Sequence, residues 1–300
     1  MNALVREFYY YYWLLRTWNV RRKFPKYQIM TLEQTLAAIV KERKSVSRLG
    51  DADFLLLIEE RDVSYQRLSK EIAQRLQAVL DCRDPRFLAC LPDTLVDQSE
   101  CRRSTEVHWK SFVYKYGQRL ARCFDTNYTY GNSNMTRIYM NFHDKTKSPE
   151  LFRQIKTIWN QKHVVIVEGK FTRFGIANDL LDNALSVKRI IGPHMNAFES
   201  IDTIKNALLN FSKDEVLFLF SLGPTATILC HELAIEGYWA VDIGNLDLEY
   251  MWMKAGATEK VSIKGRFSVE TSTSVMDLTL DPVDAKVYQE SIVLDLSIAE

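Results

Sequence analysis

Hydrophobic positions recur along the chain at helical spacing in some segments and as short, strand-length runs in others. In TLEQTLAAIV (31–40), Thr31 and Gln34 form a capping-box pattern, and apolar residues follow at helical spacing. Amphipathic helical patterns also cover 68–80 and 109–120, while the apolar runs VSRLG and RFLACL have strand length. The first half of the chain is therefore predicted to mix helices with short strands.

The second half alternates more regularly. Ser148 is a predicted N-cap, with Pro149 at the first helical position. The strands HVVIVEG, VKRIIGP, EVLFLFSLG and YWAVDIGN then follow, separated by helices predicted over NDLLDNA, FESIDTIKNALLN and TATILCHELAIEG. This alternation implies right-handed crossovers and a mainly parallel sheet. We expect an α/β fold, a Rossmann-like open sheet flanked by helices.

The predicted organisation has three parts. Residues 31–256 form the α/β domain, residues 1–30 a helical N-terminal extension, and residues 257–300 a largely irregular tail packed on the same domain. Alternating stretches in the tail are candidates for edge strands or for contact with an acceptor. No repeat, low-complexity tract or flexible linker divides the chain further.

The N-terminal segment EFYYYYWLLRTW is aromatic but does not have the pattern of a signal peptide, because it carries Glu7 and Arg16 and has no small-residue cleavage site. No run reaches the ~20 uncharged apolar residues of a membrane span. We favour an amphipathic helix packed on its own domain. Peripheral contact with a membrane, or contact with a partner subunit, stays open.

Charge and cysteine content narrow the function classes. The chain has 39 basic and 38 acidic residues, a net charge of +1, which argues against nucleic acid as a partner. Its five cysteines include no CxxC pair, so a reduced, cytoplasmic setting is expected. The five histidines are scattered and are predicted to lie on the surface or in the core, and no GxSxG motif suggests acyl-transfer hydrolysis.

Polar residues gather after four of the predicted strands. Ligands of open parallel sheets bind beyond the carboxyl ends of the strands, so these positions carry more weight than others. The four segments are RLGDAD (48–53), EGKFTRFGIAND (168–179), SLGPTAT (221–227) and VDIGNLDLEY (241–250).

SLGPTAT has the features of a phosphate site. Gly223 permits close backbone approach, and Thr225 or Thr227 adds a hydroxyl beside the free N–H groups of a helix N-terminus. The segment lacks the lysine of a Walker A loop and the GxGxxG of a dinucleotide fold. A well-capped turn without a ligand is the alternative.

RLGDAD offers Asp51 and Asp53 as ligands for Mg²⁺ or Mn²⁺ shared with a diphosphate, because these ions prefer oxygen ligands. Arg48 is expected to neutralise the same phosphates or to hold the aspartates, with Gly50 beside them. A solvated turn is the alternative for such a short motif.

The other two segments supply candidates for sugar contact and for a base. Arg173 can meet phosphate, and Asp247 or Glu249 can deprotonate an acceptor hydroxyl. The alternatives are a salt-bridged loop in which Asp179 caps a helix, and carboxylates favoured at a helix start. The remaining candidates for ribose, sugar or phosphate contact are Glu168, Gly175, Asn178, Asp179 and Asp242.

Together, SVSRLGDADF, HVVIVEGKFTRFGIANDLLDNA, RIIGP and SLGPTATILCHELAIEGYWAVDIGNLDLEYMW resemble the bacterial glucosyltransferases of the GT-D fold, formerly a domain of unknown function. The resemblance covers residues 32–252. It implies a GT-D-type fold, a nucleotide-sugar donor such as UDP-glucose with a divalent ion, and transfer of a hexose to a glycan or glycoprotein acceptor, as in serine-rich adhesin glycosylation.

The chain departs from the family pattern at three positions. The family motif RxGDGE has Ala52 and Asp53 here in place of its glycine and glutamate, and Asn245 stands where the family commonly has histidine. These departures leave two alternatives open. One is another phosphoryl or nucleotidyl enzyme, and the other is a non-catalytic or altered homologue that acts as an interaction subunit.

Overall fold

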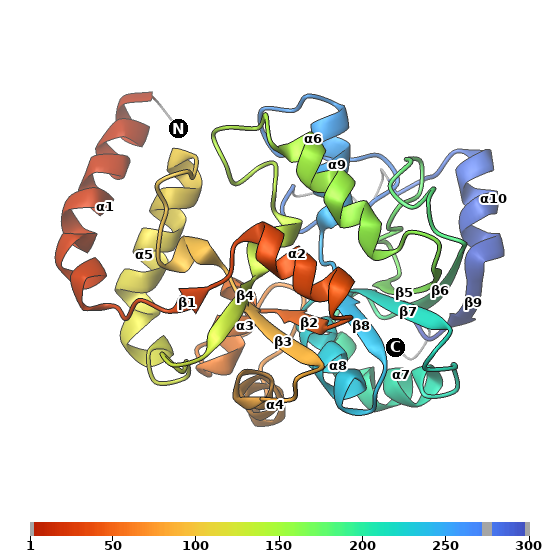
Figure 1. The fold of residues 1–300 in the computed structure, drawn as a ribbon. Helices are drawn as coiled ribbons and strands as arrows, with labels where there is room; N and C mark the ends of the chain where they lie inside the picture. Colours follow the sequence, from red (N-terminus) through yellow and green to blue (C-terminus); the bar gives the residue numbers. More distant parts are fainter. Residues whose placement is uncertain (1–2, 272–277, 298–300) are drawn as a thin grey trace.

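The computed structural model describes residues 3–271 and 278–297, in which a single nine-stranded sheet has the order β1-β4-β3-β2-β8-β7-β5-β6-β9 (Figure 1). Every pair of neighbouring strands is parallel, as predicted. The strands are β1 (Gln28–Ile29), β2 (Ser45–Arg48), β3 (Phe87–Leu91), β4 (Thr129–Asn132), β5 (His163–Gly169), β6 (Ser186–Gly192), β7 (Val216–Ser221), β8 (Trp239–Asp242) and β9 (Ile292–Asp295).

Helices cover both faces of the sheet. The α-helices are α1 (Ala3–Lys23), α2 (Leu32–Lys41), α3 (Asp51–Leu57), α4 (Lys70–Asp81), α5 (Arg103–Leu120), α6 (Ser148–Ile155), α7 (Ile201–Leu208), α8 (Pro224–Ile235), α9 (Leu246–Lys254) and α10 (Pro282–Ser291). Short 3₁₀ turns are η1 (Asp93–Leu95), η2 (Ser133–Thr136), η3 (Lys156–Ile158) and η4 (Ala197–Ser200).

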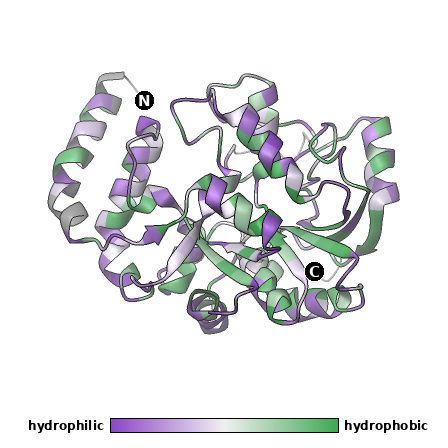
Figure 2. Cartoon of the chain, in the orientation of Figure 1, coloured by the Kyte–Doolittle hydropathy of each residue, from purple (hydrophilic) through white to green (hydrophobic). Residues whose placement is uncertain are grey.

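The core consists of two hydrophobic layers, one on each face. Helices α3, α4, α5, α7 and α8 bury their apolar sides in one layer, and α2, α6 and α9 bury theirs in the other. The central strands are buried along nearly their whole length and are strongly hydrophobic in Figure 2, as expected for a parallel sheet covered on both sides. The central strands therefore present only their ends to solvent, whereas the edge strand β9 is largely exposed.

Local sequence signals were confirmed at some helix ends and wrong at others. Thr31 and Gln34 form the predicted reciprocal capping box at the start of α2. Ser148 is not an N-cap but the first residue of α6, and its hydroxyl donates to the Ile138 carbonyl oxygen at 2.6 Å. Tertiary contact thus replaced a local cap.

The helix predicted over NDLLDNA is absent from the structure, which has turns between β5 and β6. Gly175 and Ala177, which come directly before this segment, have positive φ angles, so no right-handed helix runs into it from the preceding residues. The Leu180 carbonyl oxygen accepts a hydrogen bond from the Trp159 indole at 3.1 Å, and the side chain of Leu180 is buried. Packing of the leucines therefore overrode their helical spacing.

The two ends of the chain add elements to the domain. Helix α1 packs on α5, where Tyr10 donates to Glu106 at 2.9 Å and the rings of Trp13 and Tyr114 meet edge to face. The tail, expected to be largely irregular, contains α10 and β9, and β9 forms an edge strand beside β6. No helix among the described residues is long and apolar enough to cross a membrane.

Candidate active site

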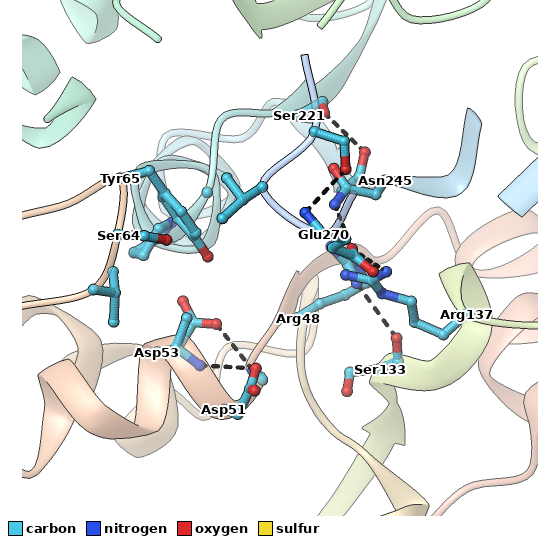
Figure 3. A pocket seen from close by; sticks show the side chains of 18 of the residues that line it. Arg48, Asp51, Asp53, Ser64, Tyr65, Ser133, Arg137, Ser221, Asn245 and Glu270 are labelled. Carbon is cyan, nitrogen blue, oxygen red and sulfur yellow. Dashed lines mark hydrogen bonds and ion pairs between the residues drawn. The ribbon is translucent and has the colours of Figure 1, made fainter. Parts of the chain in front are cut away.

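A cleft of about 900 Å³ opens at the carboxyl ends of the strands. Its walls include the turn after β2, the loop at 61–66, the first turns of α5, the segment 133–141, the turns after β5, β6, β7 and β8, and the tail at 259–270. Figure 3 shows Asp51 and Asp53 at the start of α3, with Tyr65 beside them and Arg48, Arg137 and Glu270 across from them. Seven predicted site residues line it: Arg48, Gly50, Asp51, Asp53, Gly223, Thr227 and Asp242.

Arg48 and Asp242 form a bidentate pair at the ends of β2 and β8. The Arg48 Nε donates to the Asp242 carbonyl oxygen at 2.9 Å, and Nη2 lies 3.0 Å from Asp242 Oδ1. A Cβ on Gly244, which has a φ of 42°, would lie 1.8 Å from Arg48 Nη2, so this glycine leaves the room that the guanidinium needs. Arg48 is therefore held mainly by its aspartate, which favours a positioning role.

Asp53 is buried and both of its carboxylate oxygens have partners. Oδ2 accepts from the Gly50 N–H at 2.9 Å, and Oδ1 lies 3.1 Å from the Thr227 hydroxyl. Burial and the nearby charge of Asp242 raise the pKa of Asp53 to about 7 against these hydrogen bonds. Asp53 thus fixes the turn after β2 against α8.

Asp51 differs from Asp53 in facing the cleft, with its side chain half exposed. Its Oδ2 lies 3.1 Å from Nε2 of His108, which extends from α5. Desolvation raises the pKa of Asp51, but the hydrogen bond and charge of His108 outweigh it and lower the pKa below the ordinary value. Asp51 is therefore an ionised carboxylate available to a ligand.

The N-terminus of α8 forms another wall. Gly223 is its N-cap, with a φ of 55°, and a Cβ there would lie 2.8 Å from a ring carbon of Tyr65. The free N–H groups of this helix end lie next to an aromatic ring that also lines the cleft. Thr225 is fully buried outside the cleft lining, and its hydroxyl has no hydrogen-bond partner among the described residues.

The segment 168–179 lies outside the cleft lining, except for Gly169, Phe171 and Thr172. Glu168 is fully buried, 2.6 Å from Arg189, and accepts from the Phe174 N–H at 2.7 Å. Arg173 donates to the Gly265 carbonyl oxygen at 2.5 Å and to that of Leu278. These side chains fold the loop and bind it to the tail.

The predicted base residues are also engaged elsewhere. Asp247 accepts from the Gly175 N–H at 3.0 Å and from the Asn178 amide at 2.8 Å, and forms a buried ion pair with Arg266. Glu249 is fully buried and accepts from two backbone N–H groups, those of Tyr139 and Met140. Burial raises the pKa of Glu249. Neither carboxylate lines the cleft.

Asp179 lies at the surface, half exposed. It accepts from the Tyr250 hydroxyl at 3.0 Å and lies 3.3 Å from the Lys254 ammonium. It does not line the cleft. Asp179 therefore lies apart from the predicted donor-binding residues that line the cleft.

The cleft contains residues that the sequence did not single out. Four of them come from loops and from the tail, where no strand-end rule applies. The fifth, His108, extends from α5 and was expected to lie on the surface or in the core. A Tyr or Arg in a loop carries no positional signal of its own in a single sequence. These cleft residues are Tyr65, His108, Arg137, Lys260 and Glu270.

Comparison with known proteins decides the family. A family model described as the glycosyltransferase GT-D fold matches residues 46–271, a range that includes every predicted site residue. The chain belongs to this glycosyltransferase family. The resemblance noted in the sequence is thus confirmed, and so is the expected α/β fold.

Named relatives support the assignment. The "Probable glycosyl transferase Gly" of Streptococcus gordonii is 32% identical over 271 residues, which cover 90% of this chain and 39% of the relative. "Glycosyltransferase GlyD" of Streptococcus pneumoniae is 30% identical over 89% of this chain and 32% of its own length. This GT-D chain therefore spans less than half the length of these two relatives.

Solved structures agree closely with the fold. A structure described as a new glycosyltransferase (DUF1792) from Streptococcus sanguinis has a TM-score of 0.83 and 31% identity over 90% of this chain and 100% of its own. A selenomethionine structure of the domain of unknown function 1792 reaches a TM-score of 0.86 at 30% identity, covering 93% of this chain and 99% of its own.

The GT-D resemblance implies a divalent ion, and the cleft partly fits one. Asp51 is ionised and half exposed in the cleft, and Mg²⁺ or Mn²⁺ needs only one or two protein carboxylates when phosphate oxygens and water complete its shell. Asp53 fits less well as a direct ligand because two donors already bind its oxygens. No set of three or more His, Cys, Asp or Glu arranged for a metal occurs among the described residues.

Proposed function

We propose that this GT-D chain transfers a hexose from a nucleotide diphosphate sugar, with UDP-glucose the first donor to test, to a glycan or glycoprotein acceptor. The observation that carries the proposal is the cleft itself. It combines an ionised, half-exposed carboxylate at Asp51, a helix N-terminus at Gly223 and a guanidinium at Arg137, at the edge of the sheet where such ligands bind.

The residues of the cleft suit departure of a nucleoside diphosphate. Negative charge grows on the leaving phosphate as the glycosidic bond breaks, so groups that stabilise it lower the barrier. Arg137 and the N–H groups at the start of α8 are such groups. Asp51 would hold the Mn²⁺ or Mg²⁺, which would supply further positive charge to the diphosphate.

Three residues position this machinery. Arg48 and Asp242 join the ends of β2 and β8, and Asp53 joins the turn after β2 to Thr227 on α8. A phosphate site built from two strand ends depends on such links, because small displacements weaken charge stabilisation steeply. Asp247 and Glu249 receive no support as the acceptor base, since both are buried away from the cleft.

The acceptor and the setting stay proposals. Transfer to an adhesin-type glycoprotein rests on the resemblance alone, and a cytoplasmic setting agrees with five free cysteines. Helix α1 has exposed apolar side chains, among them Phe8 and Leu15. They are the candidates for peripheral contact with a membrane or for contact with a partner subunit.

The proposal is tested by thermal shift with UDP, GDP, CDP, ADP and UDP-glucose, with and without Mn²⁺, on the wild type and Asp51→Ala. Ligand at 100 times its dissociation constant adds about 2.7 kcal/mol to the free energy of unfolding, which raises the melting temperature measurably. We expect metal-dependent stabilisation by uridine nucleotides only, and its loss in Asp51→Ala.

A second measurement separates the alternatives. Release of UDP from UDP-glucose that requires an added sugar acceptor indicates transfer, whereas release of UMP, or cleavage without an acceptor, favours a phosphoryl or nucleotidyl enzyme. No stabilisation by any nucleotide would contradict the proposal and favour a non-catalytic interaction subunit.

A further inference from the structure

Three donors converge on one carboxylate at the wall of the cleft. Glu270 forms an ion pair with Arg137, lies 2.5 Å from the Lys260 ammonium, and accepts from the Asn245 side-chain amide at 2.9 Å. The donors come from different segments: the stretch after η2, the tail, and the N-cap of α9. Figure 3 shows Arg137, Asn245 and Glu270 gathered beside the cleft.

This donor set matches an anionic ligand better than it matches a structural need. Arg, Lys and a side-chain amide are groups that bind phosphate oxygens, and here they converge on a single anion. Glu270 is the one acid in the set, and the cations lower its pKa far below the ordinary value. A carboxylate so held occupies the position that a phosphate oxygen of a ligand would take.

The availability of Arg137 distinguishes it from the other strand-end arginine. Arg48 has two bonds to Asp242, both to a residue of the sheet itself. Arg137 has its close contact with Glu270, and its next acid, the buried Glu249, is 3.9 Å away. Release of Glu270 would therefore leave Arg137 with its longer ion pair to Glu249 and with guanidinium donors available to a ligand in the cleft.

Glu270 belongs to a segment whose base is anchored to the core. The buried Arg266 pairs with Asp247, and the Phe267 N–H donates to the Phe171 carbonyl oxygen at 3.1 Å. Beyond this anchor, Val269 is exposed and Glu270 lies in the cleft wall. A short movement past the anchor would withdraw the carboxylate without disturbing the core.

We propose that Arg137, Lys260 and Asn245 form the diphosphate subsite of the cleft, and that Glu270 occupies it until a nucleoside diphosphate displaces the carboxylate. This inference rests on the proposed function and adds the residues that hold the phosphates. It also gives Asn245 a role as a neutral donor to the anion. Donor affinity is set by competition with an internal carboxylate, so removal of that carboxylate tightens binding.

The test is the dissociation constant of UDP and of inorganic pyrophosphate, measured by titration calorimetry with Mn²⁺ present. We expect Glu270→Gln to bind both ligands at least about fivefold more tightly than the wild type. Glu259→Gln is the matched control. Glu259 has the same charge, lies in the same segment and lines the cleft, and it makes no ion pair with another described residue. Its affinity should stay within about twofold of the wild type.

Arg137→Gln and Lys260→Gln complete the set. Each should weaken UDP and pyrophosphate binding by about tenfold, both alone and combined with Glu270→Gln. Equal or weaker binding by Glu270→Gln overturns the displacement, and full affinity in Arg137→Gln overturns the subsite. Binding by the wild type without these variant effects leaves the proposed function standing, whereas no binding by any variant overturns both.

Hydrogen exchange on the wild type provides a readout that needs no substitution. Pyrophosphate should speed amide exchange in 268–271 while exchange in the anchor at 266–267 stays unchanged. Slower exchange in 268–271 on binding would show that the segment closes over the ligand with Glu270 in place, and would overturn the displacement.

Discussion

Two pairs of strand ends carry residues that suit ligand binding, but one pair lines the cleft and the other is buried in the interior. The turns after β2 and β7 bring Asp51 and Gly223 to the cleft, while the loop after β5 and the start of α9 bring Glu168 and Asp247 to the interior. All four lie at the carboxyl end of a parallel strand, in the turn that follows it, or in the first turn of the next helix. The position of a residue after a strand thus indicates the edge of the sheet where a ligand can bind. It does not by itself indicate which side chains reach that ligand.

The difference lies in what covers each pair. The tail of the chain lies over the loop after β5, and its Arg266 supplies the cation that Asp247 needs. Glu168 obtains its cation from Arg189 on β6. A buried charge is costly unless it is paired, so each of these acids forms an ion pair that joins two segments of the chain. Asp51 has no such cover and pairs with a half-exposed histidine.

The largest expected effect comes from breaking a cross-link. Arg266→Met should lower the free energy of unfolding by about 3–5 kcal/mol, because it leaves Asp247 buried without its cation. Denaturant unfolding measures the loss. Arg266→Met with Asp247→Leu should recover part of the stability. A loss of less than about 1 kcal/mol in the single variant would show that the buried pair is not what holds the tail.

Asp51→Asn should have the opposite profile. We expect UDP-glucose turnover to fall about a hundredfold, equivalent to about 2.7 kcal/mol, because the carboxylate that would hold the ion is lost. Stability should change by less than about 1 kcal/mol because the side chain is half exposed. Steady-state kinetics beside denaturant unfolding checks both. Equal losses of turnover, or equal losses of stability, in Asp51→Asn and Arg266→Met would contradict the distinction between the cleft carboxylate and the buried ion pair.

Asp53 should make stability depend on pH. Its pKa is raised to about 7, so between its ordinary value near 4 and about 7 the folded chain keeps a proton that the unfolded chain releases. The contribution to stability is present at low pH and is lost as pH rises through about 7, by up to about 1.4 kcal/mol per pH unit. Urea unfolding between pH 5 and 8 should show this slope in the wild type and a flatter one in Asp53→Asn. Identical slopes would contradict the assignment.

The smallest effect is expected at Asp179. Asp179→Ala removes surface contacts with Tyr250 and Lys254, so stability should change by less than about 1 kcal/mol. UDP affinity should match the wild type because the residue lies outside the cleft. Calorimetric titration of UDP is the check. A clear loss of UDP affinity would show that the loop after β5 does contribute to donor binding.

The sequence by itself determined the layered α/β fold, since alternating apolar periods and caps are local or near-local signals. It also placed the turns after β2 and β7 at the ligand edge, through the rule for parallel sheets. It could not distinguish Asp51 from Asp53, although both lie in one turn. One faces His108 and the other Thr227, and those contacts join residues far apart in the chain.

Tertiary structure alone decided which charges are free. Burial and pairing depend on segments such as the tail, whose Arg266 pairs with Asp247 on α9 and whose Glu270 pairs with Arg137, 133 residues earlier in the chain. A single sequence records that Arg137 and Glu270 exist and nothing of their contact. The free energy of a charged group depends on its burial and on the charges around it. Those surroundings form only when distant segments of the chain pack together in the folded protein.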